Sequence, residues 1–272
     1  ALSSVNGKYA TGIPKGVIIE NKGIARLVKN TDYVQVNSHD RILGISNPVF
    51  DGSTFDIWGA LLNGATLYIS EKDLVLNFQL LAEEIVSNEI SVAFMTTVLF
   101  NSLVDSGVQE VGCLRKILFG GEKVSVHHVN KFIECFGKGK LLHVYGPTEN
   151  TTFSTFYEVN KTYTNTVPIG KPIANTQCYI LSENKTLQPI GVPGELYVAG
   201  LGVAKGYLNK EELTNKSFIN NPFQKDSILY KTGDLGKKDR TNAIEILGRI
   251  DRQVKIRGIR VELDDIKQNI LN

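Results

Sequence analysis

The chain of 272 residues could form one large domain or two modest ones, and its 42% hydrophobic and 21% charged residues are ordinary for a globular protein. A formal net charge of +2 gives no electrostatic reason to expect nucleic acid or an anionic membrane as a partner. No apolar run approaches the ~20 residues that span a bilayer, so we expect no membrane partner.

Three cysteines, Cys113, Cys135 and Cys178, are widely spaced and lie in apolar surroundings. We interpret them as buried free thiols rather than disulfide partners, metal ligands or a nucleophile. Such thiols suit a reducing compartment, and the first residues lack the pattern of a secretory signal, so we expect a cytoplasmic protein. The histidine spacing offers no zinc site, and His127 and His128 are expected on a helix surface.

Short apolar runs alternate with helical patterns through the first half of the chain. The predicted strands are residues 66–70, 91–95, 114–119 and 141–144, and the predicted helices are residues 77–87, 126–136 and a segment ending at Leu103. In the helix 77–87 we expect Leu80, Leu81 and Ile85 to form the apolar face. This alternation predicts an α/β fold with a mostly parallel sheet and flanking helices.

After about Phe153 the pattern changes to short strands between Gly, Pro and Asn turns. The predicted strands are residues 167–170, 178–181, 195–199, 228–231 and 243–247. We therefore expect an α/β part over residues 1–153, followed by a smaller strand-rich, barrel-like subdomain over residues 154–250. Residues 251–272 begin a strand and then a helix near Glu262 that has nothing to pack against. We expect the chain to be a piece that ends inside a further subdomain.

Three segments in the second half combine turn-forming glycines with charged side chains. They are residues 145–149 (YGPTE), 230–234 (YKTGD) and 248–258 (GRIDRQVKIRG). This composition suits a nucleotide site better than a core, although each segment alone could be an exposed turn. Together they resemble the adenylation domains of nonribosomal peptide synthetases, which belong to the adenylate-forming superfamily with acyl-CoA ligases and luciferases.

The resemblance implies roles in binding ATP and Mg²⁺ for the first of these segments. Tyr145 would pack near the adenine and Thr148 would contact the phosphate. Glu149 would hold Mg²⁺, which prefers oxygen ligands beside substrate phosphates. Further nucleotide contacts are expected at the strand ends, where ligands of parallel sheets gather, from Gly120, Gly121, Glu122 and Gly146.

In the later segments, Asp234 resembles the aspartate that accepts hydrogen bonds from the ribose hydroxyls, and Arg249 resembles the arginine that also contacts the ribose. Asp251 matches the hinge about which a small C-terminal subdomain swings, so it need not take part in the chemistry. Residues 200–208 (GLGVAKGYL) resemble a further family motif, to which we assign a structural role.

Residues 11–17 (TGIPKGV) resemble the end of the family's phosphate-binding loop, whose amides and hydroxyls cradle the phosphates. This assigns Thr11, Gly12 and Lys15 to ATP. Upstream, where the family has a Thr-Ser-Gly-Thr/Ser pattern, this chain has GKYA at residues 7–10. Tyr9 would crowd the phosphates or force the loop away, and the change is either natural or an artefact near the N-terminus.

Residues 50–53 (FDGS) resemble the family segment whose aspartate pairs with the α-ammonium of the substrate. Asp51 in an otherwise uncharged pocket would select α-amino acids. The alternative is a helix N-cap ahead of Ile57, in which Ser53 could be the cap while Asp51 serves the substrate. Carried over by position, the pocket lining is Asp51, Gly52, Phe55, Phe94, Leu118, Gly120, Val144, Thr152 and Phe153.

A lining with no second charge predicts a medium apolar side chain, because a buried unpaired charge is costly. We expect isoleucine, then valine or leucine, with leakage among them since one methylene is worth only ~1–3 kcal/mol.

The resemblance implies an enzyme that activates an amino acid with ATP as aminoacyl-AMP. The acyl group would then pass to the phosphopantetheine of a peptidyl carrier domain, and a condensation domain of the same synthetase would be a further partner. A lysine that the family uses in adenylation would fall beyond Asn272, so we expect the isolated chain to adenylate poorly. The alternatives are an acyl- or aryl-CoA ligase, against which Asp51 argues, and a catalytically silent nucleotide-binding fragment.

Overall fold

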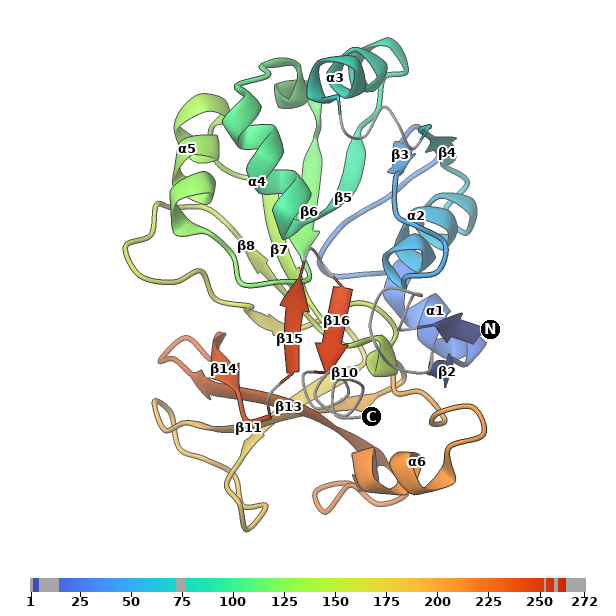
Figure 1. Ribbon diagram of the computed structural model, residues 1–272, viewed down its shortest axis with the longest axis vertical. Helices are drawn as coiled ribbons and strands as arrows, with labels where there is room; N and C mark the ends of the chain where they lie inside the picture. The colour runs from blue at the N-terminus through green and yellow to red at the C-terminus, as the bar shows by residue number, and fades with distance from the viewer. Residues whose placement is uncertain (1, 5–14, 72–76, 252, 257–258, 263–272) are drawn as a thin grey trace, which may run out of the picture.

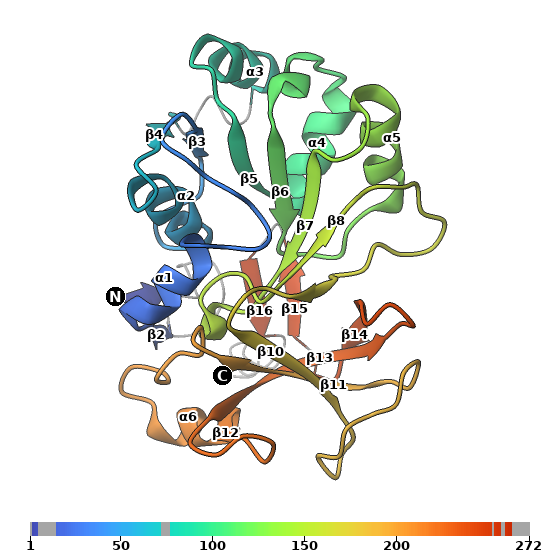
Figure 2. The ribbon, with the colours of Figure 1, turned by 180° about the vertical axis from the view of Figure 1, so that it is seen from behind.

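The structure is a computed structural model that describes residues 2–4, 15–71, 77–251, 253–256 and 259–262. Two units lie one above the other, an α/β unit and a strand-rich unit (Figure 1), and the view from behind shows the same division (Figure 2). Among the described residues, no helix is long and apolar enough to cross a membrane.

The described strands of the α/β unit form one seven-stranded sheet in the order β4-β3-β5-β6-β7-β8-β9. Its strands are β3 (Arg41–Gly44), β4 (Thr66–Ile69), β5 (Val92–Thr96), β6 (Lys116–Gly120), β7 (Leu141–Tyr145), β8 (Thr155–Glu158) and β9 (Lys171–Pro172). The ladders from β4 to β7 are parallel, whereas β8 and β9 pair antiparallel. The predicted mostly parallel sheet with flanking helices is confirmed.

Helices cover both faces of this sheet (Figures 1 and 2). The helices are α1 (Asn21–Val28), α2 (Gly52–Leu61), α3 (Phe78–Ser87), α4 (Thr97–Ser106) and α5 (Val126–Phe136). On β6, Ile117 and Phe119 join the core under α3, α4 and α5, and Leu118 joins the core under α1 and α2. Because the central strands β5, β6 and β7 bury both faces, they appear in the sequence as continuous apolar runs.

The strand-rich unit is an antiparallel sheet in the order β10-β11-β13-β12, with β14 also paired to β13. Its elements are β10 (Thr176–Leu181), β11 (Gly194–Gly200), α6 (Glu211–Ser217), β12 (Phe218–Asn220), β13 (Ile228–Lys238) and β14 (Ile244–Arg249). A separate core that includes Leu196, Val198 and Ile244 lies against this sheet. The strand-rich part is confirmed, while the proposed division at residues 153 and 250 stays a prediction.

Two short antiparallel pairs of strands and two 3₁₀ turns complete the described elements. They are β1 (Leu2–Ser4) with β2 (Gly16–Ile18), β15 (Gln253–Ile256) with β16 (Ile259–Glu262), and the turns η2 (Glu110–Cys113) and η3 (Thr148–Asn150). The helix predicted to start near Glu262 lies outside the described residues.

Two local predictions about these elements are wrong. Residues 167–170 do not form a strand, because only Gly170 makes an isolated bridge, to Ile244. Gly170 has φ of 83°, and a Cβ there would lie 1.8 Å from the Phe156 carbonyl oxygen, so the chain turns here instead of running straight. Leu80 is 41% exposed, because the inner face of α3 is made by Leu81 and Ile85.

The cysteine prediction is wrong in part. All three thiols are free, but Cys113 and Cys135 are exposed and only Cys178 is buried. Cys135 lies on α5, whose buried residues include Phe132 and Ile133. Apolar neighbours in the sequence therefore did not mean that Cys135 itself is buried. His127 is exposed on the same helix, as predicted.

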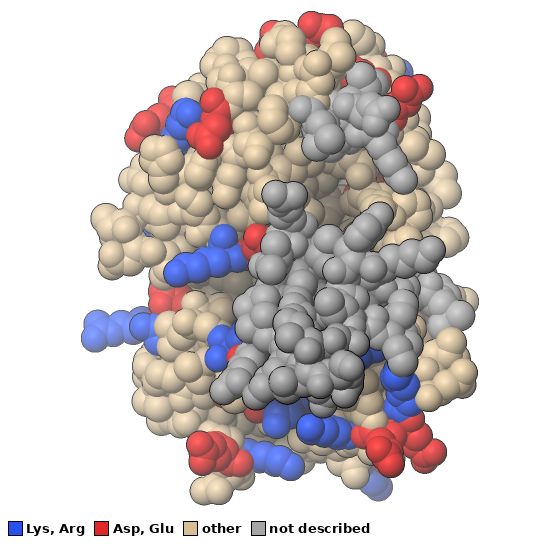
Figure 3. Space-filling view, in the orientation of Figure 1, with Lys and Arg blue, Asp and Glu red and all other residues tan. Residues whose placement is uncertain are grey.

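Charged side chains are spread unevenly over the face seen in Figure 3. Lysines and arginines gather mainly over the lower half, mixed with acidic side chains, whereas the upper half is largely uncharged. The charged residues described on this face therefore form no stripe of a single sign.

Candidate active site

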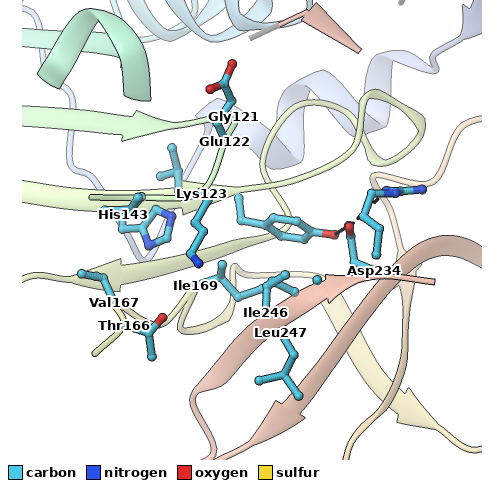
Figure 4. Close-up of a pocket in the computed structure, with 15 residues that line it drawn as sticks. Gly121, Glu122, Lys123, His143, Thr166, Val167, Ile169, Asp234, Ile246 and Leu247 are labelled. Carbon is cyan, nitrogen blue, oxygen red and sulfur yellow. Dashed lines mark hydrogen bonds and ion pairs between the residues drawn. The ribbon is translucent and has the colours of Figure 1, made fainter. Parts of the chain in front are cut away.

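A cleft of about 420 Å³ lies where the carboxyl ends of β6 and β7 meet β13 and β14 of the strand-rich unit. Its lining includes Gly121, Glu122, Tyr145, Asp234, Gly248 and Arg249. Lys123 extends into it from above, towards Ile169, and Ile246 and Leu247 line the opposite side (Figure 4). The structure thus brings together predicted nucleotide contacts that are about 130 positions apart in the chain.

Asp234 lies at the centre of a hydrogen-bonded group in this cleft. The Tyr145 hydroxyl donates to Asp234 Oδ2 at 2.5 Å, and Arg249 Nη1 donates to Asp234 Oδ1 at 3.0 Å. Burial, with the Asp234 carboxylate as a second cause, raises the pKa of Tyr145 far above its usual range, so the phenol keeps its proton and donates. A carboxylate held this way can still accept hydrogen bonds from neighbouring hydroxyls, because each oxygen has two lone pairs.

Arg249 joins Asp234 to the predicted hinge residue. Its Nε donates to Asp251 Oδ1 and its Nη2 to Asp251 Oδ2, both at 2.6 Å. Asp234 and Arg249 are also directly opposite each other in the β13–β14 ladder. Gly233 leaves room for this group, since a Cβ there would lie 2.6 Å from Arg249 Nη2.

The YGPTE segment leaves β7 through Gly146 and enters η3. A Cβ on Gly146 would lie 2.1 Å from the Thr152 carbonyl oxygen, which explains the glycine at this position. Glu149 is only 1% exposed, and its Oε1 accepts a hydrogen bond from the Tyr207 hydroxyl at 2.5 Å. The Thr148 hydroxyl donates to Asp51 Oδ2 at 2.6 Å.

The predicted pocket residues form one cluster on the α2 side of the sheet. Phe55, Phe94, Leu118, Val144 and Phe153 belong to the same buried core. The Phe153 ring centroid lies 5.4 Å from that of Phe55 and 5.1 Å from that of Phe94. The strand pairing places Phe94 opposite Leu118, so these side chains are neighbours on one face.

Two glycines shape this cluster. A Cβ on Gly52 would lie 2.7 Å from the Phe94 ring, and a Cβ on Gly120 would lie 2.0 Å from the Val144 carbonyl oxygen. Neither position accepts a side chain without movement of its neighbour. The two glycines therefore set how closely α2 approaches β5 and how closely β6 approaches β7.

Asp51 stands at the N-cap of α2, but its carboxylate makes no capping hydrogen bond. Ser53 lies inside the helix and its hydroxyl donates to the Phe50 carbonyl, so the prediction that Ser53 is the cap is wrong. Thr152 Oγ1 donates to the Asp51 carbonyl at 2.9 Å. The Asp51 carboxylate thus faces the YGPTE segment instead of its own helix.

The predicted phosphate-loop residues Thr11 and Gly12, and Tyr9 upstream of them, lie outside the described residues. Lys15 is described, directly before β2, and is half-buried. Among the described residues, no group of three or more His, Cys, Asp or Glu side chains could hold a metal ion.

The AMP-binding enzyme family matches residues 10–208, most of the chain. The chain belongs to the AMP-binding enzyme family. Bacitracin synthase 1 of Bacillus licheniformis is 53% identical over 96% of this chain, which spans 5% of the synthase. The chain therefore corresponds to a small part of that relative's length.

Solved structures point to the same AMP-binding fold. PA1221, an NRPS protein containing adenylation and PCP domains, has a TM-score of 0.89 and 32% identity over 99% of this chain and 47% of that one. The N-terminal subdomain of Klebsiella oxytoca NpsA in complex with 3-hydroxybenzoyl-AMSN has a TM-score of 0.82 and 30% identity over 91% of this chain and 63% of that one. The resemblance to nonribosomal peptide synthetase adenylation domains is confirmed.

Two side chains that no sequence motif indicated lie against Glu149 and the residues that follow it. Tyr207 lies in the segment given only a structural role, yet its hydroxyl binds Glu149. Arg26 on α1 is 4% exposed and donates to main-chain oxygens directly after Glu149. A tyrosine among glycines and a lone arginine on an amphipathic helix carry no signal of such contacts, because only the fold brings them near residue 149.

Proposed function

We propose that this chain is the central part of an adenylation domain that activates an apolar α-amino acid as aminoacyl-AMP. The observation that carries the proposal is the 2.6 Å hydrogen bond from Thr148 to Asp51. It joins the segment expected to contact the ATP phosphate to the carboxylate expected to bind the substrate ammonium. An α-amino acid bound at Asp51 would then present its own carboxylate towards the nucleotide.

The surroundings of Asp51 support an apolar side chain on the substrate. Phe94, Leu118 and Val144 are buried aliphatic or aromatic residues, and a further buried charge would be costly among them. We propose isoleucine as the preferred substrate, then valine or leucine. Discrimination among these three is expected to be modest, since one methylene is worth only ~1–3 kcal/mol in an apolar pocket.

The nucleotide would lie in the cleft between the two units. Tyr145 would contact the adenine, and Asp234 and Arg249 would contact the ribose, as their positions in the cleft support. ATP is a substrate here, and the amino-acid carboxylate would attack its α-phosphate and release pyrophosphate. The protein would contribute chiefly alignment of the two substrates and charge stabilisation, because phosphoryl chemistry of this kind needs little covalent help.

Glu149 fits the role of a Mg²⁺ ligand. Its carboxylate is buried and oriented by Tyr207, and Mg²⁺ is usually held by one or two carboxylates together with substrate phosphates. The bound ion would neutralise charge on the phosphates. A peptidyl carrier domain bearing phosphopantetheine and a condensation domain are the proposed partners, in keeping with the adenylation and PCP domains of PA1221.

The test is amino-acid-dependent exchange of pyrophosphate into ATP by the complete adenylation domain that contains this chain. The panel comprises isoleucine, valine, leucine, phenylalanine and glutamate. Exchange led by isoleucine is the expected result. Exchange led by phenylalanine or glutamate would keep the reaction and reject the proposed pocket.

An aryl or acyl acid is the second candidate substrate, because NpsA was solved with a 3-hydroxybenzoyl ligand. Including 3-hydroxybenzoate in the panel separates the two candidates. Exchange with 3-hydroxybenzoate and with none of the amino acids would contradict the ammonium role of Asp51. Replacement of Asp51 by asparagine should abolish exchange with isoleucine if that role is right.

A further inference from the structure

A buried arginine on α1 binds the segment that follows the YGPTE motif. Arg26 Nη2 donates to the carbonyl oxygens of Asn150 at 2.6 Å and Thr151 at 3.1 Å. Its Nη1 donates to the carbonyl oxygen of Phe153 at 2.7 Å and to Thr176 Oγ1 at 2.9 Å. One guanidinium therefore holds three of the four carbonyl groups between residues 150 and 153.

No carboxylate of the described residues forms an ion pair with Arg26. Burial lowers the pKa of Arg26 to about 10, so the side chain is still charged at neutral pH. A buried cation is costly unless polar groups replace its water, and here main-chain carbonyl dipoles do so. A planar guanidinium has five donors spread over three nitrogens, so Arg26 can bind carbonyls that lie farther apart than the three donors of a single ammonium nitrogen can reach.

The segment that Arg26 holds has an unfavourable backbone. Thr151 has φ of 52° and Thr152 has φ of 66°, and such angles are rare for β-branched residues. Strain of this kind persists only where the surroundings impose it. The bend sends Glu149 towards Tyr207 and brings Thr152 to the Asp51 carbonyl.

Two glycines from distant segments make room for this contact. A Cβ on Gly202 would lie 2.2 Å from Arg26 Nη2, and a Cβ on Gly23 would lie 2.6 Å from Thr151 Oγ1. The Thr151 hydroxyl in turn donates to the Gly202 carbonyl at 2.7 Å. Helix α1 and the turn at residue 202 thus enclose the segment from both sides.

We propose that Arg26 is a positioning residue that holds residues 150–153 so that Glu149 and the pocket wall at Thr152 and Phe153 align on the same substrate. The inference rests on the proposed function and extends it. Selection of the amino acid and activation by ATP share one strained segment, and a residue outside both sites fixes its shape. Loosening the segment should therefore impair both steps together.

The test compares the Arg26→Lys variant with wild type in the complete adenylation domain. We expect kcat/KM for isoleucine in pyrophosphate exchange to fall about ten- to hundredfold, the effect of losing charge-assisted hydrogen bonds. The isoleucine-to-valine ratio of kcat/KM should also fall towards one, which a merely structural role would not cause. The matched control is Arg115→Lys, at the far end of β6, where the guanidinium binds Asp40. It should change neither value.

A second variant keeps the test open if Arg26→Lys does not fold. Gly202→Ala leaves Arg26 in the chain but puts a methyl group where its Nη2 lies, and should reproduce both effects in weaker form. Thermal midpoints measured on the same samples separate instability from misalignment. Folded variants with wild-type kcat/KM and a wild-type isoleucine-to-valine ratio would overturn the proposal.

Amide hydrogen exchange over residues 145–156 gives a readout that needs no substrate. We expect exchange in this segment to be about tenfold faster in Arg26→Lys, with little change in the peptides of α5. Unchanged exchange would overturn the positioning role whatever the activity. A loosened segment in a domain that activates no amino acid would reject the proposed function and leave the positioning role standing.

Discussion

At the scale of single residues, Glu149 and Tyr207 form a buried polar pair in which a neutral hydroxyl orients a carboxylate. The hydroxyl occupies one lone pair of Oε1 and limits the directions in which the carboxylate can point. A carboxylate that keeps one orientation binds a cation with less loss of freedom than one that turns. Loss of the Tyr207 hydroxyl should therefore weaken the binding of a cation at Glu149, and not only lower the stability of the fold.

Replacing Tyr207 by phenylalanine should weaken binding of Mg·ATP about tenfold, because one hydrogen bond to a charged group is lost. The measurement is the KM for Mg·ATP in pyrophosphate exchange by the complete domain, at saturating isoleucine. The control is Tyr179→Phe, whose ring stacks on Phe223 at 4.9 Å in the strand-rich unit. An unchanged KM for Mg·ATP in Tyr207→Phe would contradict the proposal that Tyr207 orients Glu149 to hold the ion.

The buried His143 should make the stability of the protein depend on pH. Burial lowers the pKa of His143 from 6.5 to about 4, and its Nδ1 donates to the Pro168 carbonyl at 2.7 Å. Between pH 4 and 6.5 the unfolded chain binds a proton here that the folded protein does not bind. The free energy of unfolding should therefore decrease as the pH falls through this window, by about 3 kcal/mol from this group.

The check on His143 is the slope of unfolding free energy against pH, from urea unfolding at several values between pH 4 and 7. His143→Asn should flatten that slope relative to wild type. The variant should also be less stable at every pH, because it loses the stacking of His143 on Phe119. This does not affect the test, which compares only the slopes. Parallel slopes would show that His143 titrates normally in the folded protein.

At the scale of helices and strands, the sequence predicted an element correctly where its apolar residues repeat with one clear period. The predicted helix 126–136 has the bounds of α5, because its apolar positions repeat at helical spacing and Gly137 ends it. The predicted strand at residues 167–170 failed because Val167 and Ile169 bury their side chains from a loop. A short apolar run alone does not distinguish a strand from a loop that buries its side chains.

In the candidate site, too, the sequence indicated only the residues that lie in recognisable local motifs. Asp51, Glu149 and Asp234 could be selected because short motifs surround them, and the fold brings them to one region. Arg26 and Tyr207 could not be selected, since their roles arise only from contacts across more than 50 positions of sequence. Local sequence carries turns and periodicity, while such contacts are a property of the assembled sheet.

The packing of β6 against β7 gives a prediction at this scale. Gly120→Ala would place a Cβ 2.0 Å from the Val144 carbonyl oxygen, so the two strands must separate or bend. We expect a loss of about 1–3 kcal/mol of unfolding free energy, as for other overpacked sites. Urea unfolding measures this loss. The control is Gly59→Ala on α2, where the atom nearest to the new Cβ would be a side-chain methyl at 3.3 Å. Equal stability of the two variants would contradict the close approach.

At the scale of the whole molecule, the cleft belongs to neither unit alone. Tyr145 comes from the α/β unit and Asp234 from the strand-rich unit, and a hydrogen bond of 2.5 Å joins them. Arg249 continues the connection to Asp251 on the way to β15. A ligand that binds in this cleft therefore contacts both units and should stabilise them against separation.

The proposed contact between Asp234 and the ribose would make this stabilisation specific for ribonucleotides. A ligand that binds only the folded state raises the free energy of unfolding by RT ln(1 + [L]/Kd), about 2.7 kcal/mol at a hundredfold excess over Kd. ATP should therefore raise the thermal midpoint of the complete domain, while 2′,3′-dideoxy-ATP at the same concentration should raise it much less. Asp234→Asn should bring the two nucleotides to nearly the same small shift, because an amide accepts fewer hydrogen bonds than a carboxylate. If the dideoxynucleotide protects wild type as well as ATP does, Asp234 does not bind the ribose, and its carboxylate serves only to hold Tyr145 and Arg249 across the cleft.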